Sequence, residues 1–590
     1  MKILGISAFY HDAAAALVID GLPVAAVQEE RLSRRKNDAE FPMKAIEWCL
    51  DSAALEPEEL DAVIFYERPA LKFDRVLMTL LRSFPHSWRA FPHAMNNMLG
   101  EKLWVRGVIA AQLGIDARRI LFTDHHVSHA AAAFLTAPTE EAAILTADGV
   151  GEWATFTVGQ GSKRVGGPTK IDLLREVRFP HSLGLFYSAF TAFLGFKVNE
   201  GEYKVMGLAA YGTPRFAQEV RRILQRTADG AFALDLAYFD YHRAVESAYS
   251  RAFIDLFGPP RDRFEPIDLA SERGQHYADV AASAQLVLEE VMVGIATSLR
   301  KETGLSDLCL GGGVALNGVA NARILQEAGF ERLFVPSAPG DAGCALGAAL
   351  WADRVHFGRP HSDCPDHPFW GPCVDADDLA RIAAEDELPF AKLNEPELID
   401  SVVEAIVGGA IVGWMEGAAE FGPRALGHRS ILADPGDAAM RDRLNRDIKF
   451  REAFRPFAPV VPVEQADSFF ALPPGGARLG RFMSGVFPVR SEWRDRLRAV
   501  THVDGTARVQ VLERAMAPRL HALLTAYGRR RRGLPVLLNT SFNLAGDPIV
   551  TSVAEGYSTF RRAGMDLLVA DDGLARRQRS RQHQPMEKVA

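Results

Sequence analysis

The sequence predicts an α/β protein built from more than one domain. The chain has 590 residues, enough for roughly three or four domain-sized units. It is 48% hydrophobic and 24% charged, a globular composition that excludes wholesale disorder. Short apolar, strand-like runs alternate with segments of helical periodicity. A unit of strand, polar turn and strand also occurs twice, about 135 residues apart, which indicates an internal duplication.

The N-terminal region contains the first copy of this unit. Residues 2–7 predict a strand, residues 9–12 a turn, and the runs on either side of Asp20-Gly21 predict a hairpin, residues 14–19 and 23–28. The second copy begins at Ala142. Residues 183–196 form an uncharged apolar stretch of about 14 residues, shorter than the roughly 20 that span a bilayer, and predict a buried helix.

Helices and strands alternate in the rest of the first half. Apolar spacing predicts a helix over residues 279–300. Beyond it the expected elements are a strand, a glycine turn, a helix, a strand, a loop and a helix, at residues 307–310, 311–313, 314–327, 332–336, 338–343 and 344–355. These elements extend the α/β pattern to about residue 358.

A proline-rich stretch without periodicity, residues 359–378, predicts a linker between domains 1–358 and 379–573. The second domain again alternates, with a helix at 396–407 and strands at 410–415, 535–539 and 565–570. The tail, residues 574–590, is basic and poor in apolar residues, and predicts a frayed end.

Charge and cysteine content narrow the class of protein. The net charge of −8 argues against nucleic acid and an anionic membrane as partners, because both require clustered positive charge. The five cysteines are too scattered for a disulfide framework, and the N-terminus has no secretory signal. A cytoplasmic location is the simplest interpretation.

A candidate metal site begins with His125 and His129, whose i, i+4 spacing puts both imidazoles on one helix face. Asp148 and Asp341 follow predicted strands and precede glycines, so their side chains can reach a cleft. The four together would suit iron, manganese or zinc. On spacing alone, two ordinary histidines explain the pair equally well. A peptidase of the His-Glu-x-x-His type is disfavoured because His126 occupies the glutamate position.

Two glycine-rich segments are candidate nucleotide contacts. The turn Gly311, Gly312 and Gly313 precedes a helix that carries Asn317, an arrangement that can place backbone against phosphate or ribose. It matches neither the Rossmann nor the P-loop pattern, and tight helix–strand packing is an equal alternative. The loop 199–212, which contains Lys204, is polar in an apolar region and predicts a ligand-lining segment.

The second domain carries a cationic cluster suited to phosphate. Its basic members, set among glycines, prolines and aromatic residues, include Arg424, Arg429, Lys449, Arg451, Arg455 and Arg508. Thr540, Ser541 and Asn543 follow a strand and can complete such a pocket. On strands, Lys449 would share a face with Arg451, and Ser541 with Asn543. The alternative is a set of solvated arginines.

These motifs together resemble the O-carbamoyltransferase family of nodulation-factor and antibiotic biosynthesis. The resemblance covers about residues 1–573, in the order SAFYHDAAAALV, QEERLSRRKND, HHVSHAA, LTADGVGEWAT, GEYKVMGLAAYG, CLGGGVALN, PGDAGCALGAAL, EFGPRALGHRSILADP, IKFREAFRPFAP, THVDGTARVQ and LNTSFN. It implies a duplicated actin/Hsp70-like ATPase domain followed by a domain similar to threonylcarbamoyl-AMP synthase (YrdC-like).

The resemblance also implies a reaction and its cofactors. Carbamoyl phosphate and ATP with Mg²⁺ would give carbamoyl-adenylate in the C-terminal domain, through Lys449, Arg451, Ser541 and Asn543. The N-terminal domain would pass the carbamoyl group to a small-molecule hydroxyl. The family's ligands correspond to His125, His129, Asp148 and Asp341, with iron(II) or another divalent transition metal, and His11 would lie beside the acceptor hydroxyl.

Other interpretations remain open at this point. An ATP-dependent sugar kinase on the same fold leaves the cationic cluster unexplained, and a tRNA-modifying carbamoyltransferase conflicts with the net charge. A zinc knuckle of Cys364, His367 and Cys373 is a minor alternative for the linker. The acceptor itself is not specified. Residues 70–110 would serve as an acceptor cleft, as core or as a homodimer contact.

Overall fold

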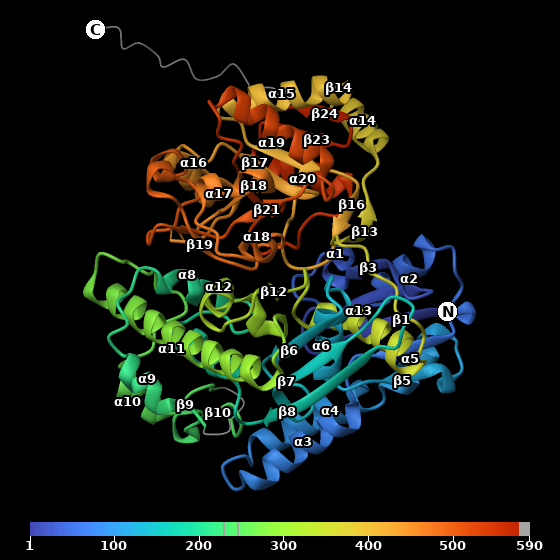
Figure 1. Ribbon diagram of the computed structural model, residues 1–590, viewed down its shortest axis with the longest axis vertical. Helices are drawn as coiled ribbons and strands as arrows, with labels where there is room; N and C mark the ends of the chain where they lie inside the picture. Colours follow the sequence, from blue (N-terminus) through green and yellow to red (C-terminus); the bar gives the residue numbers. More distant parts are fainter. Residues whose placement is uncertain (228–229, 245–246, 453, 578–590) are drawn as a thin grey trace.

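The computed structural model describes residues 1–227, 230–244, 247–452 and 454–577 (Figure 1). The chain is an α/β protein, as predicted. Strands from residues 2–334 form two five-stranded sheets, and strands from residues 390–576 form one eight-stranded sheet. In Figure 1 the part with the eight-stranded sheet, in orange and red, lies above the other two.

The two five-stranded sheets have the same topology, which confirms the predicted duplication. In each sheet, the strand that comes first in the chain (β1 or β6) begins an antiparallel run of three strands. On its other side lie two further strands that are parallel to it. The orders are β3-β2-β1-β4-β5 and β8-β7-β6-β11-β12. The strands are β1 Lys2–Ser7, β2 Ala14–Ile19, β3 Leu22–Gln28, β4 Ala62–Phe65, β5 Ile120–Phe122, β6 Glu141–Ala147, β7 Ala154–Ser162, β8 Lys170–Arg178, β11 Asp307–Gly311 and β12 Arg332–Phe334.

Two helices lie between these sheets. Helix α6 (His125–Leu135) packs on β6 and β11, α13 (Asp341–Trp351) packs on β1, β2 and β4, and the helices contact each other. The close approach requires Gly347, since a Cβ there would lie 2.1 Å from the carbonyl oxygen of Ser128. Each helix therefore begins with a candidate metal ligand, and the packing brings the two starts together.

The first half of the chain also contains further helices and a small hairpin, some of which pack on the two sheets and some only on other helices. They are α1 Glu29–Ser33, α2 Met43–Ser52, α3 Pro69–Arg82, α4 Ala90–Leu99, α5 Val105–Leu113, α7 Leu183–Phe193, α8 Glu202–Ala209, α9 Ala217–Ile223, α10 Arg251–Phe257, α11 Glu272–Thr303, α12 Gly318–Glu327, β9 Leu224–Arg226 and β10 Phe232–Leu234. The helix expected at 183–196 is the buried α7.

Helix α11 is long and apolar enough to cross a membrane by length and composition alone. However, 72% of its most apolar window is buried inside the protein. It packs against α7, α8, α9 and α12. Figure 1 shows α11 on the left, between α8 and α9. Its apolar character is thus accounted for by the core of this half of the chain.

The eight-stranded sheet has the order β14-β24-β23-β15-β17-β22-β18-β21. Its strands are β14 Phe390–Lys392, β15 Val412–Met415, β17 Arg429–Ala433, β18 Ala458–Pro462, β21 Gln510–Leu512, β22 Leu537–Ser541, β23 Leu567–Ala570 and β24 Gly573–Arg576. Associated elements are α14 Ala376–Glu385, α15 Glu395–Val407, α16 Ala438–Arg443, α17 Ala466–Phe469, α18 Gly476–Gly480, α19 Pro518–Arg530, α20 Val553–Ala563, β19 Phe487–Pro488 and β20 Thr506–Ala507.

The stretch 359–378 contains regular structure that its prolines did not indicate. Strand β13 (Phe369–Cys373) pairs with β16 (Ala418–Glu420), and α14 begins at Ala376. The start of the expected frayed tail is also ordered, because β24 pairs with β23, whereas residues 578–590 lie outside the described residues. Among the described residues, Cys364, His367 and Cys373 do not gather as a metal-binding group.

Candidate metal centre and anion pocket

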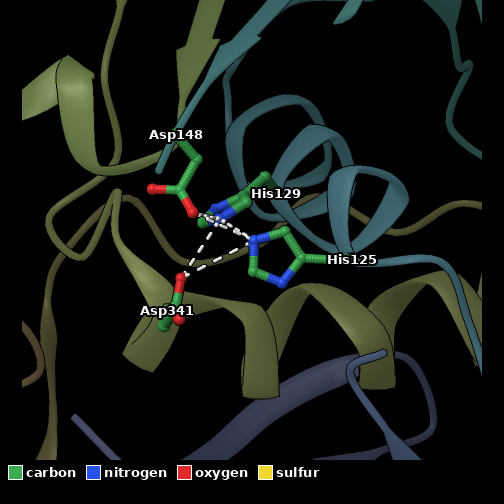
Figure 2. A group of neighbouring side chains, drawn as sticks. All are labelled: His125, His129, Asp148 and Asp341. Atoms are coloured by element: carbon green, nitrogen blue, oxygen red, sulfur yellow. Dashed lines mark hydrogen bonds and ion pairs between the residues drawn. The ribbon is translucent and has the colours of Figure 1, made fainter. Parts of the chain in front are cut away.

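The structure brings His125, His129, Asp148 and Asp341 together (Figure 2). Their candidate ligand atoms all lie within 4.8 Å of one another, and all four side chains are buried. Nε2 of His129 lies 3.1 Å from Nε2 of His125 and 3.4 Å from Oδ1 of Asp341. Nε2 of His125 lies 3.1 Å from Oδ2 of Asp148. Two nitrogens and two carboxylates thus converge on one point.

This arrangement fits a divalent transition metal. Neither oxygen of Asp341 has a hydrogen-bond partner among the described residues, although the residue is 0% exposed. A buried carboxylate without hydrogen bonds is strongly unfavourable unless a cation offsets its charge. Burial opposes ionisation of Asp148, but its interactions with His125 and His129 hold the pKa of that carboxyl well below its usual value. The mixed N/O set suits iron, manganese or zinc.

The neighbouring His126 has a different role. Its Nδ1 lies 2.6 Å from the Thr146 hydroxyl, and its Nε2 lies 3.0 Å from the carbonyl oxygen of Ala154. Burial, with the adjacent histidines, holds its pKa well below the usual value. His126 therefore fastens α6 to the second sheet as a neutral ring.

The glycine turn lies at this centre. The amide of Gly313 donates to Oδ1 of Asp148 at 2.8 Å. A Cβ on Gly312, whose φ is +92°, would lie 2.2 Å from the carbonyl oxygen of Ala147. The side chain of Asn317 caps α12 through the amide of Ala320 and is also hydrogen-bonded to Gln285. The contacts of Asn317 are thus structural, and its assignment to nucleotide binding stays a prediction.

His11 follows β1 in a tight turn between Phe9 and Asp12, both at positive φ. Its Nδ1 lies 3.1 Å from Oδ2 of Asp12. Burial acts to lower the pKa of His11, but the negative charges of Asp341, Asp12 and Asp148 outweigh it and raise the pKa to about 9. The ring therefore lies close enough to the carboxylates of the metal centre for their negative charge to raise its pKa.

Lys449, Ser541 and Asn543, three of the residues predicted for the anion pocket, are in contact in the second half of the chain. Nζ of Lys449 lies 2.6–3.3 Å from four oxygen atoms of the other two residues. Lys449 and Arg451 do not lie on a strand, the condition under which they would share a face: Lys449 ends a π-helical turn, Leu444–Ile448, and Phe450 has a φ of +40°. Asn543 likewise lies beyond the end of β22.

Arginines gather beside this lysine. Burial, together with the charges of Arg424, Arg451 and Arg455, holds the pKa of Arg508 well below its usual value. Burial and Arg455 lower the pKa of Arg451 to about 9, and burial lowers that of Arg424 to about 10. Mutual repulsion of this kind indicates a pocket that a bound polyanion would stabilise. Thr540 directly precedes Ser541 on β22.

Arg429 does not belong to this pocket. It is fully buried, and its guanidinium donates to the carbonyl oxygens of Thr551, Glu416, His428, Pro372 and Gly417. The side chain therefore joins β13 to the sheet of the second half. Its donors serve structure and leave none for a phosphate.

The two halves meet along the predicted ligand-lining loop. Nζ of Lys204 lies 2.8 Å from Oε1 of Glu452, and the guanidinium of Arg455 lies 4.6 Å from the ring centroid of Tyr203. A cavity that contains Arg424 is lined by both halves, through Ala315, Leu316, Pro336, Ser337, Pro339, Phe482, Met483 and Ser484. The cationic pocket and the glycine turn of the metal centre therefore border the same seam.

Comparison with known proteins decides the family. The family model for the carbamoyltransferase N-terminus matches residues 2–350, and that for the carbamoyltransferase C-terminus matches residues 403–577. The chain belongs to the carbamoyltransferase family. This carbamoyltransferase is therefore a transferase enzyme, and the resemblance drawn from its motifs is confirmed.

The named relatives of the chain include a nodulation protein and an O-carbamoyltransferase. Nodulation protein NolNO of Sinorhizobium fredii is 37% identical over 96% of this chain and 79% of its own. The 3′-hydroxymethylcephem-O-carbamoyltransferase of Amycolatopsis lactamdurans is 34% identical over 49% of this chain and 53% of its own. An uncharacterized Synechocystis protein, sll1178, is 41% identical over 97% of this chain and 96% of its own.

A solved structure, that of HypF from T. kodakarensis, is similar over 60% of this chain and 48% of its own. The identity is 16% and the TM-score is 0.30, too low to carry an argument. The duplicated topology therefore rests on the strand orders of the carbamoyltransferase itself. The YrdC-like character of its second half stays a prediction.

Two residues of the metal centre escaped the sequence analysis. Glu152 accepts hydrogen bonds from the amides of His125 and Arg68, at 3.0 and 2.7 Å, and so fixes the start of α6. Sγ of Cys344 lies 3.2 Å from Nδ1 of His129. The expected helix began at residue 344, whereas α13 begins at Asp341. Because the expected helix excluded Asp341, the sequence did not indicate that Cys344 shares a helix face with this candidate ligand.

Proposed function

We propose that the enzyme makes carbamoyl-adenylate in the cationic pocket and transfers its carbamoyl group to a hydroxyl at the metal centre. The observation that carries this proposal is the gathering of Arg424, Arg451 and Arg455 around Arg508, beside a seam shared with the metal centre. The anions carbamoyl phosphate and ATP are complementary to this positive charge, and Mg²⁺ would accompany the ATP. The names of the relatives support a natural-product or sugar-containing hydroxyl acceptor.

The first step consumes one water and two polyanions. Water cleaves carbamoyl phosphate to carbamate and phosphate. A carbamate oxygen then attacks the α-phosphorus of ATP, the bond from that phosphorus to the β-phosphate oxygen breaks, and pyrophosphate leaves. Arg424, Lys449, Arg451 and Arg508 would offset the repulsion between the substrates and the charge that develops, with Thr540, Ser541 and Asn543 as hydrogen-bonding neighbours.

The second step forms the carbamate ester. The acceptor oxygen attacks the carbamoyl carbon, the bond from that carbon to the phosphate oxygen breaks, and AMP leaves. His11 would orient the hydroxyl, with Asp12 fixing the ring. A bound cation would offset the carboxylate charges that raise the pKa of His11, so that the neutral ring could take the proton that the hydroxyl loses. His125, His129, Asp148 and Asp341 would hold a divalent transition metal, such as iron(II), which when bound supplies Lewis acidity.

Pyrophosphate release from ATP tests the division of labour. Carbamoyl phosphate should trigger the release, and Lys449→Ala should abolish it, whereas the exposed Lys392→Ala serves as a matched control. His11→Asn should release pyrophosphate but carbamoylate no acceptor. Normal release by Lys449→Ala would remove that residue from the site, and loss of release in His11→Asn would refute two separate sites. A sugar kinase would show no release that depends on carbamoyl phosphate.

A further inference from the structure

Helix α13 contacts both ring nitrogens of His129. Oδ1 of Asp341 lies 3.4 Å from Nε2, and Sγ of Cys344 lies 3.2 Å from Nδ1. Asp341 and Cys344 share a face of α13 because they are three positions apart. All three residues are 0% exposed. The imidazole is thus held between a carboxylate on the side of the metal centre and a thiol on the opposite side.

We propose that Cys344 is a positioning residue that prepares His129 to bind the metal, by accepting a hydrogen bond from Nδ1–H. This inference rests on the metal centre proposed above. A neutral imidazole that ligates through Nε2 carries its proton on Nδ1, and the partner of that proton fixes the ring. Within the described part of the chain, the sulfur of Cys344 occupies the partner position.

The contact of Cys344 has no equivalent at His125 or Asp341 in the described structure, because both lack such a hydrogen bond. The carboxylate of Asp341 is buried without a hydrogen bond in the described structure and faces the two histidines (Figure 2). Nδ1 of His125 is likewise buried and has no hydrogen-bond partner among the described residues. Of the two candidate histidine ligands, His129 is therefore the one whose far nitrogen is anchored, and the anchor is a thiol.

A thiol fixes the ring less firmly than a carbonyl or carboxylate does. Sulfur is a weak acceptor, and S–H is a weak donor. If the thiol donated to Nδ1 instead, Nε2 would carry the proton and could not ligate. Cys344 thus admits both tautomers of His129, and metal binding selects one. Removing the thiol of Cys344 should therefore weaken metal binding about tenfold, at the lower end of the range for residues that hydrogen-bond to metal ligands.

Cobalt(II) binding tests the proposal without measuring turnover. The unaltered chain, Cys344→Ala, Cys344→Ser and Cys309→Ala would be titrated with Co²⁺ by absorbance, in competition with a chelator. Alanine and serine leave nearly the same space, so their difference isolates the hydrogen bond. Cys309 lies buried on β11 and serves as the matched control. Thermal unfolding of each metal-free variant checks that it folds.

Cys344→Ala should bind Co²⁺ about tenfold more weakly than the unaltered chain. Cys344→Ser, which keeps an acceptor, should stay within about threefold, and Cys309→Ala should match the unaltered chain. Equal affinity of Cys344→Ala and the unaltered chain would overturn the role of Cys344 alone, and so would a serine variant as weak as the alanine variant. Absence of Co²⁺ binding by the unaltered chain would overturn the metal centre itself.

Discussion

The amide of Gly313 donates a 2.8 Å hydrogen bond to Oδ1 of Asp148. The glycine turn and the carboxylate, two separate signals in the sequence, thus belong to one site. The turn orients one candidate ligand and leaves its other oxygen, Oδ2, facing Nε2 of His125. The orientation of this candidate ligand therefore depends on backbone that carries no reactive group.

Gly312→Ala should destabilise the protein by about 3 kcal/mol or more. The φ of +92° strains any side chain, and the new Cβ would lie 2.2 Å from the carbonyl oxygen of Ala147. Urea unfolding measures the change. Gly340→Ala is the matched control, because a Cβ there meets nothing within 4 Å. Equal stability of the two variants would contradict the close approach of the turn to β6.

Asp341→Asn should remove the stabilisation that metal gives to the protein. In the presence of a chelator, the variant should lie within about 1 kcal/mol of the unaltered chain, because the lost desolvation cost of the carboxylate is offset by its lost pairing with His125 and His129, at 3.8 and 3.4 Å. With Co²⁺ added, the unaltered chain should gain stability and the variant should gain little. Thermal unfolding under both conditions checks this difference. An equal gain of the two proteins on addition of Co²⁺ would argue against a cation site at Asp341.

Arg508→Gln should stabilise the protein and stop adenylate formation. Burial and three neighbouring arginines disfavour the charge of Arg508, so its removal should raise the free energy of unfolding by about 1 kcal/mol. The same change removes a donor proposed for the substrates. Urea unfolding and pyrophosphate release measure the two effects. A destabilised variant with normal release would show that the arginine serves structure.

Glu416 should make stability depend on pH. Burial, with Asp571 and Glu395, raises its pKa from 4.5 to about 7 against the pull of Arg519. Between these values the folded state holds a proton that the unfolded state has released. This contribution to stability is therefore present at low pH and is lost as the pH rises through about 7.

Glu416→Gln should remove this dependence. Above the folded pKa the variant should be more stable than the unaltered chain by about 2 kcal/mol, less than the full linkage value because the carboxyl is partly exposed. Urea unfolding at about pH 5 and about pH 8 measures the difference. Glu404→Gln, at an exposed position, should leave the pH profile unchanged. Parallel profiles for all three proteins would contradict the raised pKa.

Local patterns in the sequence determined a large part of this protein. The i, i+4 spacing of His125 and His129 was enough to put both rings on one helix face, because helical geometry relates residues four apart. The Asp20-Gly21 turn was enough to predict the β2–β3 hairpin. Spacing alone could not decide whether Lys449 and Arg451 share a face, because that depended on a strand, and Phe450 between them has a φ of +40°, which no strand allows.

Only the tertiary structure decided which distant residues meet. Cys344 is separated from His129 by 215 positions, and their contact depends on Gly347 letting α13 approach α6. The same holds for the arginines around Arg508, which could be solvated in any one segment and repel one another only after folding gathers them. The periodicity of a sequence indicates which residues share one face of a helix or strand. A binding site is formed where separate helices and strands pack together, and no local pattern encodes that packing.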